Sequence, residues 1–221
     1  MGNLHQLSIL LHILAGSGAL IIGMIAFLAR KNTKQHTRYG FVFVWLMAIV
    51  VITALFGVFV FRRNTFLLVL TMLSGYNCFS GIRAIYLGGQ QPRFIDYLVP
   101  VIVISSATYY LYYINKIGLY WSPAVIYPTI GALFVLTIYD VCRGWMPITF
   151  LQKSFIYEHV YKMIAAYMAA ASAFSGTVFP QLKPYSQILP SLLGFGWIMI
   201  IFISLRKRNL PKKNNQLKQV Y

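Results

Sequence analysis

The feature that most constrains this chain is a series of seven long apolar runs, separated by short segments that hold most of the charged residues. A helix that crosses a bilayer needs about 20 mostly apolar residues. Backbone polar groups find no water in the hydrocarbon layer, so such runs must be helical. The sequence therefore predicts an all-α, polytopic membrane bundle of about seven transmembrane helices. The expected spans are 5–29, 41–61, 65–87, 97–115, 123–142, 159–179 and 188–205.

Composition excludes several other classes of protein. Of 221 residues, 59% are hydrophobic and only 10% are charged, whereas a soluble domain is about a quarter charged. The net charge of +16 would suggest nucleic acid in a soluble protein. Here the basic residues lie between apolar runs, where anionic lipid headgroups attract them. We therefore expect the lipid bilayer, and no nucleic acid, as a partner.

Cys78 and Cys142 belong to different runs, and we expect two free thiols.

The distribution of Lys and Arg predicts the orientation of the chain. With seven spans, the first connection and the C-terminal tail (206–221) lie on the same side of the membrane. The first connection holds Arg30, Lys31, Lys34 and Arg38, and the tail holds Arg206, Lys207, Arg208, Lys212, Lys213 and Lys218. The opposite side holds only Arg62, Arg63, Lys116 and Lys183. Because cytoplasmic loops carry the excess of basic residues, the N-terminus is expected outside and the C-terminus in the cytoplasm. Residues 1–205 then form one transmembrane domain, followed by a basic tail.

A group of polar residues is expected at the cytoplasmic ends of the spans. Its members are His36, Arg83, Asp140, Glu158, His159 and Lys162. One interpretation is an ion-pair network, with Glu158 paired to Lys162 four residues on and Asp140 satisfying Arg83. A second is a metal site in which His36 and His159, with Asp140 or Glu158, bind zinc or iron. A third is an anion pocket on Arg83 and Lys162.

His12 lies apart from that group, in the outer half of the first span, with His5 on the same face. It could bond a neighbouring helix, or serve as a ligand or proton relay. A heme held by His12 and His159 is excluded because their depths differ by roughly 15–20 Å. A heme with one His and a Met or Tyr partner stays open. A polar stripe on the third span could line a pathway from His12 toward the cytoplasmic group: Tyr76, Asn77, Ser80 and Arg83.

Small residues predict where the helices touch. His12, Gly16, Ala19 and Gly23 share one face of the first span, and alanines from 166 to 173 continue the face of the sixth span that begins at His159. Helices in lipid associate largely by close packing at such residues. These two helices are therefore expected at the centre of the bundle.

Two segments carry a family resemblance. The first is the run from Leu11 to Gly16, followed by Gly23 and the basic connection 36–40 (His-Thr-Arg-Tyr-Gly). The second is His159, Met163 and the alanine-rich stretch to Ala173. Together they resemble a family of bacterial polytopic membrane proteins classed as a domain of unknown function. In that family a His-Arg pair precedes the second span, and here Thr37 separates the two residues. The resemblance implies a bacterial inner-membrane protein in which His12, His36 and His159 are the positions to test; it implies no activity.

Three functions stay open from the sequence. The first is a membrane protein that depends on a metal or redox cofactor, through the cytoplasmic group or His12. The second is a transporter of small solutes or ions, favoured by the polar stripe and the seven spans. The third is a ligand-free scaffold or assembly factor. A small-molecule ligand and a homo-oligomer are compatible with the sequence, and whether the protein is an enzyme is left open.

Overall fold

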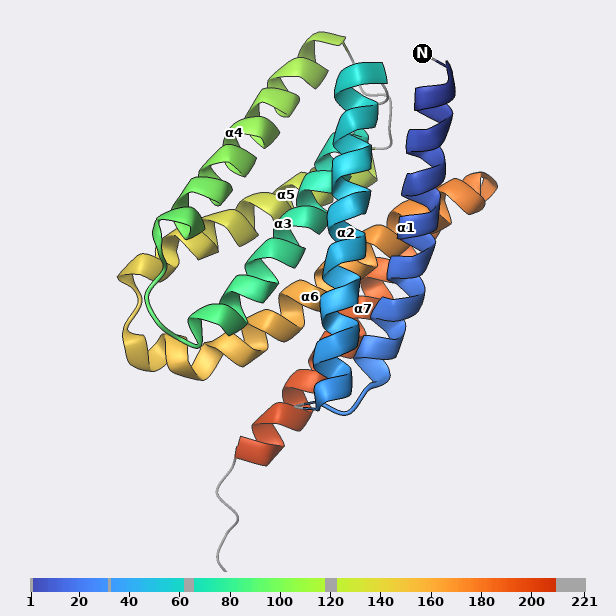
Figure 1. Cartoon of the computed structure of the whole chain (residues 1–221). Helices are drawn as coiled ribbons and strands as arrows, with labels where there is room; N and C mark the ends of the chain where they lie inside the picture. The colour runs from blue at the N-terminus through green and yellow to red at the C-terminus, as the bar shows by residue number, and fades with distance from the viewer. Residues whose placement is uncertain (1, 32, 62–65, 118–122, 210–221) are drawn as a thin grey trace, which may run out of the picture.

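The computed structural model describes residues 2–31, 33–61, 66–117 and 123–209, and these residues form an all-helical bundle (Figure 1). The expected class of fold is confirmed at this level: seven α-helices and two short 3-10 helices, with no strand in the described ranges. The helices are α1 (Gly2–Leu28), α2 (Lys34–Phe61), α3 (Phe66–Leu87), α4 (Phe94–Ile117), α5 (Pro123–Cys142), η1 (Arg143–Trp145), α6 (Ile148–Val178), η2 (Pro180–Leu182) and α7 (Tyr185–Asn209).

Successive helices run back and forth through the bundle. The start of α1 and the end of α7 lie at opposite ends of the molecule, as an odd number of passes requires (Figure 1). Helix α1 packs mainly on α2, α3 on α6, α4 on α5, and α7 on α6. Helices α3 and α6 therefore join the α1–α2 pair to the α4–α5 pair.

Five helices are long and apolar enough to cross a membrane: α1, α2, α4, α5 and α7. Helices α3 and α6 do not meet that criterion among the described residues. Both carry buried polar side chains, such as Asn77 and Ser80 on α3 and Glu158 and Lys162 on α6. A polar group at membrane depth is tolerated where it faces other helices rather than lipid.

Small residues are closely packed on α1 and α3, as predicted. Of the two helices expected at the centre of the bundle, α6 contacts α1, α3 and α7, whereas α1 packs mainly on α2, so the central place expected for α1 is wrong. A Cβ atom at Gly23 of α1 would come within 2.7 Å of the Tyr167 ring and 2.9 Å of the Phe43 ring. At Gly81 of α3 it would come within 2.9 Å of Met163 Sδ. Glycine is therefore required where α1 meets α2 and α6, and where α3 meets α6.

Three helices extend well beyond the expected spans, and the first of these is α2, which begins at Lys34 rather than Phe41. Helix α6 begins at Ile148 rather than His159, because the segment before His159 is helical outside the apolar run that defined the prediction. Helix α7 continues through the first basic residues of the predicted tail to Asn209. Arg62, Arg63 and residues 210–221, on which part of the orientation argument rests, lie outside the described residues. Both cysteines are free, as expected.

Candidate functional site

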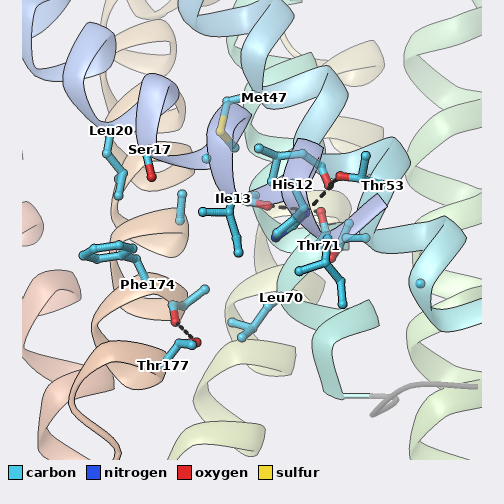
Figure 2. A pocket seen from close by; sticks show the side chains of 18 of the residues that line it. His12, Ile13, Ser17, Leu20, Met47, Thr53, Leu70, Thr71, Phe174 and Thr177 are labelled. Carbon is cyan, nitrogen blue, oxygen red and sulfur yellow. Dashed lines mark hydrogen bonds between the residues drawn. The ribbon is translucent and has the colours of Figure 1, made fainter. Parts of the chain in front are cut away.

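A cavity of about 500 Å³ lies between α1, α2, α3 and α6 (Figure 2). His12 and Thr53 stand on its wall, and His5 lies on the same face of α1, as its spacing from His12 predicted. The remaining lining residues are Ser8, Ile9, Ile13, Gly16, Ser17, Leu20, Met47, Val50, Ala54, Gly57, Val58, Leu70, Thr71, Ser74, Ala169, Ala170, Ala173, Phe174, Thr177 and Val178.

The cavity is open because several residues on its wall have small side chains or none. Gly16 faces the cavity from α1, Gly57 from α2, and Ala170 and Ala173 from α6. A Cβ atom at Gly57 would meet no heavy atom within 4 Å, and one at Gly16 would meet only Val50 at 3.9 Å. These residues leave the cavity open, whereas Gly23, two turns from Gly16, is in close contact with its neighbours. The small-residue face of α1 therefore serves both packing and the cavity.

His12 is held to α2 by a hydrogen bond between its Nδ1 and Thr53 Oγ1, 2.9 Å apart (Figure 2). The Thr53 hydroxyl lies 2.7 Å from the Ile49 carbonyl and 3.0 Å from the Val50 carbonyl, which accept its hydrogen. The Thr53 oxygen then accepts the Nδ1 hydrogen of His12. The interpretation of His12 as a residue that bonds a neighbouring helix is confirmed, and Thr53 is a partner that sequence reasoning missed. A hydroxyl within a membrane span was the available signal.

Asp140 is the centre of a buried polar network near the other end of the bundle. Lys162 of α6 approaches Asp140 Oδ1 to 2.5 Å, and the Lys162 side chain is 1% exposed. Tyr76 donates to Asp140 Oδ2 at 2.7 Å, and Ser80 donates to the same oxygen. One carboxylate on α5 thus binds α3 and α6 together.

Glu158 extends this network along α6. Its Oε2 lies 3.5 Å from Lys162 Nζ, the pair predicted from the four-residue spacing, and 3.2 Å from Arg143 Nε. Its Oε1 accepts hydrogen bonds from Tyr139 at 3.0 Å and Ser154 at 2.8 Å. Two carboxylates therefore face two buried cations, which balances the formal charge of this group. The participation of Arg143 was not predicted from the sequence.

Arg83 belongs to a different ion pair. Its Nε and Nη2 donate to the two oxygens of Asp96, at 2.6 and 2.7 Å. The expected pair between Arg83 and Asp140 is therefore wrong. Gly88 and Gly89, with positive φ angles, reverse the chain after α3 and bring the start of α4 back to Arg83. No periodicity within one helix could reveal this contact.

The polar stripe on α3 is divided between these groups. Tyr76 and Ser80 bind Asp140, Arg83 binds Asp96, and Asn77 donates to the Leu73 carbonyl of its own helix at 2.8 Å. Ser74 and Thr71, about one and two turns before Asn77 on α3, line the cavity. None of the four residues of the predicted stripe lines the cavity, and their side chains mainly join helices.

His36 and His159 are each fixed by a backbone carbonyl of another helix. His36 Nδ1 lies 2.9 Å from the Ala26 oxygen, and His159 Nδ1 lies 2.9 Å from the Gly81 oxygen. His159 is close enough to His36 and Lys31 to interact with them electrostatically. A carbonyl only accepts, so both Nδ1 atoms carry a hydrogen.

The structure does not assemble the expected metal ligands into one site. Asp140 and Glu158 bind Lys162 and Arg143, whereas His36 and His159 bind the backbone carbonyls of Ala26 and Gly81. Within the described ranges, no group of three or more His, Cys, Asp or Glu side chains could hold a metal ion. Zinc or iron binding therefore stays a prediction from residue types alone.

Comparisons of the chain with family models, curated proteins and solved structures found no match. The resemblance to a bacterial membrane family stays a prediction for that reason.

Proposed function

We propose that this chain is a multi-pass protein of the bacterial cell membrane, with all seven helices crossing and the C-terminus in the cytoplasm. Five helices have the required length and apolarity. The proposal for α3 and α6 is supported by their place between the other helix pairs, where lipid contact is reduced. The orientation is supported by the basic residues at the α1–α2 connection, which lies toward the same end of the bundle as the end of α7 (Figure 1).

The proposed activity is binding of a lipid-soluble small molecule within the membrane. The observation that carries it is the cavity of about 500 Å³ with His12 on its wall. Ligand sites in proteins are concave, mostly apolar, and carry a few placed polar groups, in volumes of roughly 300–1,000 Å³. The cavity has a volume in this range, and its lining is mostly apolar with a few histidine and hydroxyl groups.

A purely structural role for the same helix faces is less well supported. If Gly16, Gly57 and the alanines of α6 served only association, the helices would close on them, as they do at Gly23. Empty space in a helix bundle costs stability in proportion to its volume. Unlike the cavity, the Asp140–Glu158 network has matched charges and side chains that are in contact with one another. We therefore assign ligand binding to the cavity and helix fastening to the network.

The test compares two glycine-to-leucine variants. Gly57→Leu adds a side chain where the cavity is open, and Gly131→Leu adds the same side chain to an exposed position of α5 outside the cavity. Both changes improve helix propensity equally. The proteins are purified in detergent, and the lipid-soluble molecules they retain are extracted and identified by mass spectrometry.

We expect the wild type and Gly131→Leu to retain the same molecule at a ratio of about one molecule per protein chain. Gly57→Leu should lose it. Equal retention of ordinary membrane lipids by all three proteins would contradict the proposal. Thermal unfolding of the variants, measured in parallel, verifies that a loss of ligand does not reflect a loss of folding.

A further inference from the structure

We infer that the molecule in the cavity is neutral and bears a hydroxyl group, which donates a hydrogen bond to Nε2 of His12, while its apolar part extends along α1 toward Leu20. This inference rests on the proposed function and names the class of ligand. Alcohols, phenols and quinols share the required O–H donor.

The hydrogen bonds of His12 define what its ring offers to a ligand. Thr53 Oγ1 directs its hydrogen to the backbone of α2, so it receives the Nδ1 hydrogen of His12. A neutral imidazole with hydrogen on Nδ1 carries a lone pair on Nε2. The ring is therefore an oriented acceptor that matches a donor group on the ligand.

The charges of the chain favour the neutral imidazole and a neutral ligand. The sequence has three acidic residues, and all three are paired: Asp96 with Arg83, and Asp140 and Glu158 with Lys162. No carboxylate is thus left to stabilise a charged His12. The described lining also contains no Lys, Arg, Asp or Glu. A ligand with a carboxylate or phosphate would be buried without a partner, which is costly in an apolar site.

The shape and polarity of the cavity favour an elongated molecule. Its α1 wall runs from His5 to Leu20, which corresponds to ~22 Å of helix. Polar side chains such as Ser8, His12 and Thr53 lie toward the N-terminal end of α1. At the other end, apolar surface comes from Leu20, Met47, Ala169 and Ala170, and Ser17 contributes one hydroxyl there. A polar head near His12 and an apolar tail beyond it fit this distribution.

Photolabelling with three matched probes tests the inference. The probes are a long-chain alcohol that carries a diazirine, its methyl ether and the corresponding carboxylic acid. They are applied to the full chain in detergent, and the labelled peptides are mapped by mass spectrometry. The variants are His12→Phe, which removes the acceptor, His12→Gln, which restores an acceptor, and Gly57→Leu, which fills the cavity.

We expect the alcohol to label α1 and α6 of the wild type about five- to tenfold more than the ether does, as one lost hydrogen bond implies. The acid should label least. His12→Phe should remove the preference of alcohol over ether, and His12→Gln should restore part of it.

The outcomes separate the two proposals. Equal labelling by alcohol and ether that Gly57→Leu abolishes would overturn the hydroxyl inference and leave the proposed function standing. Labelling that Gly57→Leu leaves unchanged would overturn both. Preferred labelling by the acid would contradict the neutrality of the ligand.

Discussion

The ammonium nitrogen of Lys162 lies 2.5 Å from Asp140 Oδ1, and the two side chains are only 1% and 6% exposed. Asp140 also accepts hydrogen bonds from Tyr76 and Ser80, so this pair joins α3, α5 and α6. Breaking a buried ion pair leaves an uncompensated charge, whereas replacing both partners can be nearly neutral. The loss of one partner should therefore affect the contacts among all three helices.

Removing only one partner of this pair should destabilise the protein. We expect Lys162→Met to cost about 3–5 kcal/mol, because Asp140 is left buried and unpaired. The double variant Lys162→Met/Asp140→Asn should recover most of that loss. The measurement is thermal unfolding in detergent, read from the folded peak in size-exclusion chromatography. Lys153→Met, an exposed position on the same helix, is the control. A double variant less stable than the single one would contradict the explanation.

The Arg83–Asp96 pair should contribute less. Its side chains are 16% and 8% exposed, so water can replace part of the lost contact. We expect Arg83→Gln to cost about 1–2 kcal/mol, below the loss for Lys162→Met. The same unfolding assay provides the comparison, and an equal or larger loss for Arg83→Gln would show that the ranking by burial is wrong.

Gly23 should tolerate no side chain. A Cβ atom there would press on the Tyr167 and Phe43 rings, so Gly23→Ala should cost about 1–3 kcal/mol. At Gly40, near the start of α2, a Cβ atom meets nothing within 4 Å. Gly40→Ala should therefore be neutral or stabilise the helix by up to about 1 kcal/mol. If both variants unfold at the same temperature, close packing at Gly23 does not limit stability.

Cysteine labelling tests the proposed orientation. Trp145 and Tyr185 are 78% and 76% exposed. Trp145 ends η1, between α5 and α6, and Tyr185 begins α7, so the predicted topology places them on opposite sides of the membrane. In a background without Cys78 and Cys142, we expect a membrane-impermeant maleimide to label Tyr185→Cys in intact cells. Trp145→Cys should react only after the membrane is permeabilised. The reverse pattern would invert the topology, and labelling of both in intact cells would argue against an odd number of crossings between them.

The sequence by itself determined the all-helical architecture and the presence of helices long and apolar enough to cross a membrane. Apolar runs of sufficient length can satisfy their backbone only as helices, and this needs no knowledge of their neighbours. Contacts within one helix also need no knowledge of neighbouring helices. The pair of Glu158 and Lys162 follows from the rise and turn of a single helix. The small-residue faces of α1 and α6 also predicted close packing, as Gly23 demonstrates.

Tertiary structure decided which polar groups meet across helices. Asp140 binds Lys162 rather than Arg83, and the glycine turn after α3 places Asp96 beside Arg83. The bond from His12 to Thr53 depends on how α1 and α2 are rotated against each other. Whether a run of small residues closes on its neighbour, as at Gly23, or leaves a cavity, as at Gly57, depends on side chains from several helices at once. Periodicity assigns residues to one face of a helix, but only the packed bundle determines what that face meets.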